Sequence, residues 1–209
     1  FDENVHTFDS FKRCSFSYGK LDYENDYQKE TINKFNDFIQ SKDFFNFFLK
    51  KLFFKAAVSQ NNFLRMMKYL RYPIKDNRFV SFTDHLFSKI DVQYVFSFIK
   101  NTGGINPHVD AQRKYLSLML YFPEGEYDKD YGTTFWQSSI PNYSNTHVTK
   151  KNEIDNFKSI NKKILKTEFV PNCLYGFLRN DLSWHSVEPV DISENYIRKS
   201  ININFIYKN

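Results

Sequence analysis

The stretch VQYVFSFIKNTGGINPHVD, residues 92–110, marks the change from a helical to a strand-forming sequence. Tyr94, Phe96 and Phe98 alternate with smaller or polar residues, which is the period of two that an extended strand produces. Gly103-Gly104 interrupts the strand, and His108-Val109-Asp110 follows. The sequence therefore predicts a β-strand, a break, and a histidine and an aspartate at the start of the next strand.

Upstream of this stretch, residues 1–91 read as mainly helical. Ile32, Phe35 and Ile39 share one face of a predicted helix over residues 27–40. A second helix is predicted over residues 43–58, capped by Ser41 or Asp43, and a third over residues 62–70, ended by Pro73. The second carries rings on nearly every side, which favours burial between layers over an interfacial membrane helix.

Downstream, residues 92–209 read as short antiparallel strands. Strands are predicted over residues 92–99, 115–122, 133–136 and 169–178, and residues 183–190 and 197–207 are predicted to form a closing hairpin. The polar stretch 137–168 between them reads as a long loop, either a lid or a solvated insertion. The pattern predicts one α+β domain, residues 1–209, with helices buttressing a β-sandwich or barrel.

Composition limits the class of protein. Aromatic residues make up 19% of the 209 residues, enough to bury a core, so the chain is not disordered. Two cysteines do not make a disulfide framework, and they fit a reducing, cytoplasmic setting. No segment reads as a membrane span. The net charge of +5 is too scattered to indicate a nucleic-acid surface, although Lys150–Lys166 holds a lysine cluster.

Three residues have the chemistry of a metal site. His108 and Asp110, two apart in an extended chain, point to one face. His185 lies on a later predicted strand, and two histidines with one carboxylate form the facial triad of non-haem Fe(II) oxygenases, although zinc accepts the same ligands. Cys14, His6, His85 and His147 lack partners at ligand or catalytic spacing. Cys173 is expected to be a buried small hydrophobe on an apolar strand, and Trp184 is expected to pack away from the site.

The last strand adds an anion-binding group. Arg198 is suited to bidentate binding of a carboxylate, and the predicted hairpin places it alongside His185. Ser200 and Asn202 share its face by alternation, with Asn202 preferred to Asn204 as a site residue. Arg113 and Lys114, just after the metal motif, are candidates for an anionic substrate group or for solvated loop charges.

Over residues 94–207 these motifs resemble the 2-oxoglutarate/Fe(II)-dependent dioxygenases, particularly their prolyl-hydroxylase-like branch. The matching positions are His108-x-Asp110, His185 and Arg198-x-Ser200, with Tyr121 in the apolar strand and Gly132 before the next one, where a Gly-Gly pair is more usual. The resemblance implies a double-stranded β-helix, also called a jelly roll or cupin-like fold. Its metal would be Fe(II), held by His108, Asp110 and His185.

The same resemblance implies the co-substrate and the reaction. Arg198 would pair with the distal carboxylate of 2-oxoglutarate, with Tyr121, Ser200 and Asn202 nearby and ascorbate as a reductant. The expected reaction is hydroxylation of a peptide, amino acid or small metabolite, releasing succinate and CO2. Because Asp110 is a carboxylate, hydroxylation is favoured over halogenation. Two alternatives remain: a nucleic-acid-directed oxygenase or demethylase of the same superfamily, and a non-catalytic jelly-roll binding module.

Overall fold

The computed structural model describes residues 12–17, 25–58, 89–141 and 148–208, apart from the side chains of Leu49, Lys50 and residues 53–58. The predicted helix over residues 62–70 and the side chains of His6, His85 and His147 lie outside the described residues. The chain divides into two compact units. One holds residues 22–93 and 204–209, and the other holds residues 2–21 and 94–203.

Two helices form most of the described part of the first unit. α1 spans Asp26–Ile39 and α2 spans Lys42–Val58. The Ser41 side chain accepts a hydrogen bond from the Phe44 backbone N–H at 3.1 Å, so Ser41 is the N-cap of α2, one of the two caps expected. Phe44 and Phe45 are buried, and both rings contact the ring of Phe205. Phe47 of the same helix is 52% exposed, so the burial expected for the rings of this segment holds for only some of them.

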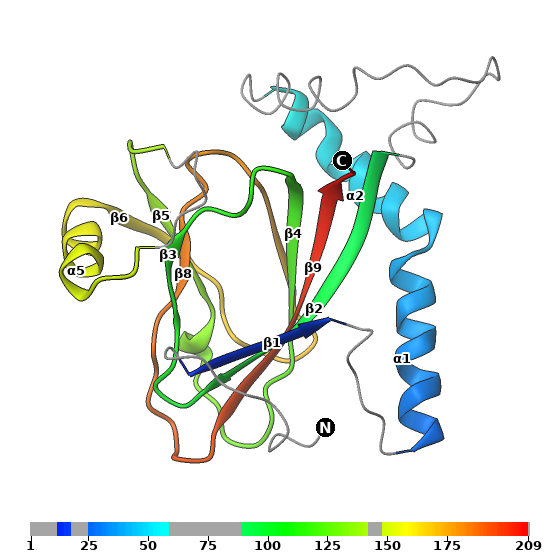
Figure 1. Ribbon diagram of the computed structural model, residues 1–209, viewed down its shortest axis with the longest axis horizontal. Coiled ribbons are helices and arrows are strands. Elements are labelled where there is room, and N and C mark those ends of the chain that lie inside the picture. Colours follow the sequence, from blue (N-terminus) through cyan, green and yellow to red (C-terminus); the bar gives the residue numbers. More distant parts are fainter. Residues whose placement is uncertain (1–11, 18–24, 59–88, 142–147, 209) are drawn as a thin grey trace. The chain divides into compact units, whose positions relative to one another are not determined.

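Nine strands in the described residues form two antiparallel sheets, shown in Figure 1. The five-stranded sheet has the order β1-β2-β9-β4-β7 and the four-stranded sheet the order β3-β8-β5-β6. The strands of the first sheet are β1 Arg13–Ser17, β2 Ile90–Lys100, β9 Ile197–Tyr207, β4 Lys114–Tyr121 and β7 Leu174–Leu178. Those of the second are β3 Ile105–His108, β8 His185–Val187, β5 Thr133–Gln137 and β6 Lys162–Lys166. The sequence predicted β2, β4 and β5 to within about two residues.

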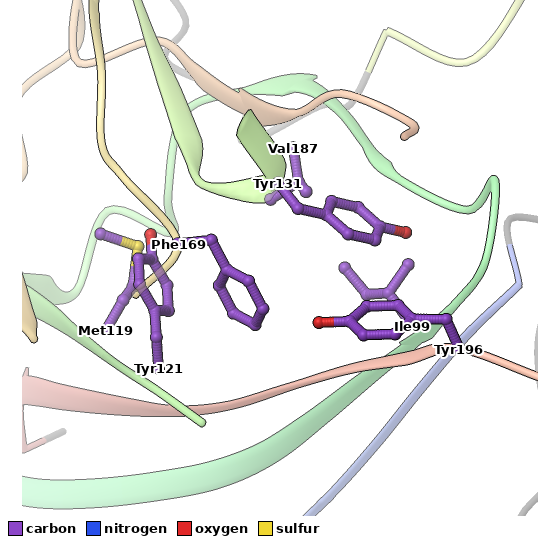
Figure 2. Packing of buried hydrophobic residues seen from close by; sticks show 7 residues of the cluster. All are labelled: Ile99, Met119, Tyr121, Tyr131, Phe169, Val187 and Tyr196. Carbon is purple, nitrogen blue, oxygen red and sulfur yellow. The ribbon is translucent and has the colours of Figure 1, made fainter. Parts of the chain in front are cut away.

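The inner faces of the two sheets meet in one apolar cluster, shown in Figure 2. Its buried members come from both sheets and from the connections between them: Ile99, Met119, Tyr121, Tyr131, Phe169, Val187 and Tyr196. Side chains alternate along each strand, so β5 turns Thr133 and Phe135 inward and Trp136 outward. The alternation of side chains therefore determines which face of each strand points into the space between the sheets.

The predicted closing hairpin was wrong. β8 and β9 lie in different sheets, so they do not pair. The link between them, residues 188–196, is nine residues long and contains Pro189, which has no N–H to continue a strand ladder. It is long enough to cross from one sheet to the other, and local alternation cannot distinguish these two outcomes.

The predicted long loop over residues 137–168 was also wrong in part. It contains helix α5, Lys151–Ile160, and strand β6, which pairs with β5. α5 contacts β3, and Phe157 of α5 packs against Trp136 and Trp184 on the outer side of the four-stranded sheet. Trp184 therefore has the packing role expected of it. No helix among the described residues is both long enough and apolar enough to cross a bilayer.

Glu188 is the residue directly after β8, and it makes ion pairs with one lysine of α5 and one lysine of β6. These ion pairs lead to a pH-dependent prediction. The Glu188 carboxylate pairs with Lys158 at 3.3 Å and with Lys163 at 2.6 Å. Burial alone would raise the pKa of Glu188, but the hydrogen bond from Lys163 and the charges of both lysines outweigh it and lower the pKa. A carboxylate with a lowered pKa stabilises the fold above its ordinary pKa, and this contribution is lost as the pH falls.

Glu188→Gln should therefore lower the free energy of unfolding at pH 7 by about 1 kcal/mol for the two ion pairs together. Below the ordinary glutamate pKa of 4.5 the difference from wild type should shrink, because the unfolded wild-type chain takes up a proton at Glu188 before the folded protein does. Urea denaturation of both proteins at pH 7 and at pH 4 measures this. An equal loss at both pH values would contradict the role given to these ion pairs.

Candidate functional site

The structure brings His108, Asp110 and His185 together. One ligand atom from each lies within 4.8 Å of the others, and all three side chains are buried. His108 and His185 are direct partners in the β3–β8 ladder, and their ring centroids are 4.2 Å apart. The sequence predicted that His108 and Asp110 begin a strand. In the structure, His108 is instead the last residue of β3, and Asp110 follows the end of that strand.

Both histidines are held in the tautomer that a metal ligand needs. His108 Nδ1 lies 2.9 Å from the backbone oxygen of Asn106, and His185 Nδ1 lies 3.0 Å from that of Ser183. Because a carbonyl oxygen only accepts, each Nδ1 carries the proton and donates it. Each Nε2 then keeps its lone pair for a metal ion. Burial lowers the pKa of His185, which favours the neutral ring.

Asp110 is held at three of its oxygen atoms. Ser117 Oγ donates to Oδ2 and Lys114 Nζ donates to Oδ1, each at 2.6 Å, and Arg179 Nε donates to the backbone oxygen at 3.0 Å. Burial alone would raise the pKa of Asp110, but its electrostatic interactions with His185, Lys114 and His108 outweigh the effect of burial. The pKa of this carboxyl therefore lies well below its usual range, and the group is ionised as a metal ligand must be.

The sequence did not predict these supporting residues. Lys114 pairs with Asp110, in place of the two roles considered for it. Ser117 interrupts the otherwise apolar strand β4, and Arg179 follows directly after β7 with 1% of its surface exposed. A polar residue inside an apolar run is a signal that could have identified Ser117, since a buried hydroxyl needs a partner.

Ser117→Ala should weaken metal binding without unfolding the protein. It removes one hydrogen bond that orients the Asp110 carboxylate, and losing such an outer-shell partner costs roughly 10- to 100-fold in metal affinity. Calorimetric titration with Co(II) measures the effect. Ser117→Thr, which keeps the hydroxyl, is the matched control and should retain most of the affinity. Equal affinity in the alanine variant would show that Ser117 does not orient Asp110.

Arg198 lies deep between the sheets, with 2% of its surface exposed. Its Nε donates to the backbone oxygen of Tyr131 at 2.7 Å, and Nη1 donates to Ser200 Oγ at 3.2 Å. The guanidinium carbon lies 5.0 Å from the ring centroids of Tyr121 and Phe169. Among the described residues no aspartate or glutamate pairs with it. A buried charge without a counter-charge is energetically costly, so the Arg198 guanidinium is suited to bind an anion.

Tyr196 supplies a second unsatisfied donor near Arg198. Its hydroxyl is buried and has no hydrogen-bond partner among the described residues. Burial raises the pKa of Tyr196 to about 12, so the hydroxyl keeps its proton, although the charge of Arg198 acts in the opposite direction. In Figure 2 this hydroxyl points toward the interior of the cluster. A ligand that brings an acceptor to this region would satisfy both Arg198 and Tyr196.

Tyr121 is fully buried between Arg198 and a pair of threonines. Its hydroxyl lies 2.8 Å from Thr133 Oγ1 and 2.9 Å from Thr167 Oγ1, and its ring faces the guanidinium. Gly132 permits this arrangement, because a Cβ there would lie 1.7 Å from the Thr167 backbone oxygen. The sequence pointed to Tyr121 and Gly132 but not to the threonines.

The remaining candidates are placed as follows. Ser200 is buried, and its Oγ accepts a hydrogen bond from Arg198. Asn202 shares the face of β9 with both by alternation and is half-buried, while Asn204 is more deeply buried. Cys173 precedes β7 and is half-buried, where a buried strand position was expected. Cys14 is buried in β1, and Arg113 is exposed.

Comparisons with known proteins give structural likenesses only. No family model matches the chain, and no curated protein matches its sequence. One similar structure is a prolyl-4-hydroxylase from Pseudomonas putida, at 19% identity and a TM-score of 0.36, with 57% of this chain and 53% of that one covered. Another is an oxidoreductase of the 2OG-Fe(II) oxygenase family from Burkholderia pseudomallei, at 10% identity and a TM-score of 0.36, covering 57% and 45%.

A third structure covers more of both chains. It is the non-heme alpha-ketoglutarate-dependent epimerase SnoN from nogalamycin biosynthesis, at 10% identity and a TM-score of 0.48, with 98% of this chain and 69% of that one covered. Of the first two structures, by contrast, this chain spans only about half the length. 2OG-Fe(II) oxygenases are among the proteins whose structures it is similar to.

Proposed function

We propose that the chain is a 2-oxoglutarate- and O2-dependent Fe(II) hydroxylase that oxidises a C–H bond of a peptide, amino acid or small metabolite and releases succinate and CO2. One observation carries the proposal. The space between the sheets holds a His-Asp-His group and, deeper in it, a buried arginine with no acidic partner among the described residues. A binding module has no evident need for both.

His108, Asp110 and His185 fit Fe(II). Two imidazole nitrogens and one carboxylate oxygen are the ligand set of non-haem iron oxygenases, and three protein ligands leave positions open for other ligands. Zinc accepts the same donors, so the arginine decides between the metals. A hydrolytic zinc site has no general need for a buried carboxylate-binding group beside it.

Arg198 fits the distal carboxylate of 2-oxoglutarate, with Ser200 and the Tyr196 hydroxyl as neighbouring donors. The spacing supports this. Tyr121, in contact with Arg198, reaches Thr133, while Phe135 on the same strand is the ladder partner of His185. Thr133 and Phe135 lie two residues apart, which is about 7 Å along a strand. A five-carbon dicarboxylate is suited to bridge an arginine and a metal separated in this way.

Each group in this chain then has a defined task. Bound Fe(II) with 2-oxoglutarate supplies the oxidising chemistry, with O2 as the oxidant. The two histidines hold their Nε2 atoms toward one point, and Ser117 and Lys114 keep Asp110 oriented. Phe177 lies 4.6 Å and Phe135 6.1 Å from the His185 ring, and these apolar walls limit water beside the metal position.

The finer assignments belong to the same proposal. The two sheets form a double-stranded β-helix, and residues 1–209 act as one oxygenase domain with a helical support region in residues 1–91. Tyr121 shapes the wall beside Arg198, and Asn202 lines the same face of β9. The substrate is a small molecule or a peptide.

The direct test is anaerobic addition of Fe(II) and 2-oxoglutarate to the metal-free protein. A visible charge-transfer band is expected when the 2-oxo acid chelates bound iron, with one equivalent of each required for saturation. A band that fails to form would refute the proposal. Release of succinate in air, in the presence of candidate peptides, free amino acids or oligonucleotides, then identifies the substrate class.

A further inference from the structure

A cavity lies on the strands that carry the two histidines. It has a volume of about 200 Å³. Its lining comes from β3, β8 and the connections beside them, together with one lysine before β1 and one on α5: Lys12, Thr102, Gly103, Gly104, Ile105, Asn106, Pro107, Lys158, Ser186, Val187 and Pro189. Cavities that bind drug-sized molecules are larger, so this one suits a small ligand.

Ser186 lines the cavity from the side of β8 that faces away from the proposed iron. Successive side chains of a strand point to opposite faces, so Ser186 points away from the face that carries His185. Its Oγ accepts a hydrogen bond from Trp136 Nε1 at 2.9 Å, and Trp136 belongs to the outer cluster with Phe157 and Trp184. The cavity is therefore distinct from the site around Arg198.

Two polar side chains of the cavity, Ser186 and Asn106, have donor groups without an acceptor among the described residues. Ser186 is 2% exposed and already accepts from Trp136, and its own proton has no acceptor among the described residues. The Asn106 carboxamide also makes no hydrogen bond within that part of the chain. A buried hydroxyl proton without an acceptor is unfavourable, so an acceptor entering the cavity would be stabilised.

Two lysines add positive charge. Lys12 Nζ donates to Thr102 Oγ1 and to the Asn101 backbone oxygen, and these hydrogen bonds hold the lysine beside the turn that follows β2. Lys158 shares Glu188 with Lys163, so that pair of lysines carries one more positive charge than its acidic partner. Positive charge combined with unsatisfied donors selects an anion with several acceptor oxygens.

We propose that this cavity binds a small oxyanion, a phosphate or a carboxylate group, with Ser186, Lys158 and Lys12 as its donors. The inference does not depend on the proposed oxygenase activity, because none of these residues belongs to the iron or 2-oxoglutarate positions. Since Asn106 and Ser186 flank His108 and His185 in the chain, an anion bound here would lie directly behind the metal-binding strands.

The test is calorimetric titration of the metal-free protein, residues 1–209, with inorganic phosphate and, separately, with acetate. Saturable binding of at least one of them, with a dissociation constant on the order of 1 mM or tighter, is expected. The preferred anion identifies the source. Tryptophan fluorescence gives a second readout, because Trp136 donates to Ser186. Absence of saturable binding of both anions would overturn the inference.

Variants locate the site. Lys158→Gln and Lys12→Gln should each weaken binding roughly tenfold, the loss expected for one charge-assisted hydrogen bond. Lys163→Gln is the matched control, because it breaks the other ion pair of Glu188 without lining the cavity, and it should bind normally. Equal losses in Lys158→Gln and Lys163→Gln would overturn the inference. Loss in Arg198→Lys would also overturn it, by placing the anion at the arginine.

Discussion

His108→Ala should abolish the charge-transfer band that Fe(II) and 2-oxoglutarate produce with the wild-type protein. The substitution removes one of three ligands whose donor atoms lie within 4.8 Å of one another. Two remaining ligands should hold the metal at least roughly 100-fold more weakly, since losing even an outer-shell partner costs up to that much. Calorimetric titration with Co(II) measures the metal affinity, and absorbance under anaerobic conditions measures the band.

Trp184→Phe is the control for this experiment. Trp184 precedes His185, yet its indole packs in the outer cluster with Phe157 and donates to the Ile140 backbone oxygen at 2.8 Å. The variant disturbs the same strand from the other side and should keep the band. A band of wild-type intensity in His108→Ala would mean that iron binds somewhere other than the His-Asp-His group.

Replacing Arg198 should separate binding of the co-substrate from stability of the fold. Arg198→Lys should weaken 2-oxoglutarate binding by roughly 100-fold, because an ammonium cannot reproduce the bidentate geometry of a guanidinium. Co(II) affinity should remain close to that of wild type. Unchanged 2-oxoglutarate affinity would show that the arginine does not bind the co-substrate.

Arg198→Met extends this prediction to stability. The guanidinium is buried without an acidic partner among the described residues, so an apolar side chain of similar length removes a desolvated charge. The lost hydrogen bond to Tyr131 offsets part of the gain. We expect the free energy of unfolding to stay within about 1 kcal/mol of wild type or to rise, while binding is lost. A fall of several kcal/mol would indicate that the arginine is a structural residue.

Local patterns in the sequence predicted the parts of the fold that local physics determines. Alternation of Tyr94, Phe96 and Phe98 identified β2, and the spacing of Ile32, Phe35 and Ile39 identified α1. These patterns report which face of an element is apolar. They do not report which strand becomes its neighbour, and for this reason β8 and β9 were assigned to one hairpin although they lie in different sheets.

The site was predicted to the extent that its chemistry is carried by residue type. The grouping of His108, Asp110 and His185 was predicted because their side chains are typical metal ligands, and the structure brings the three together. Ser117, Thr133 and Thr167 are common residue types, and only the tertiary structure shows that their hydroxyls contact Asp110 and Tyr121. α5 was missed although Ile154, Phe157 and Ile160 recur at a spacing of three, because the surrounding residues are strongly polar.

Lys114 affects the stability of the metal-free protein. Its ammonium, 2.6 Å from Asp110 Oδ1, gives the buried carboxylate a counter-charge within the chain itself. Small zinc domains, by contrast, fold only when their ion binds. Here the polypeptide can complete its folding first, and the metal ion then binds at three ligands that the fold has already brought together. A chelator should accordingly strip the ion and leave a folded protein that can be reloaded.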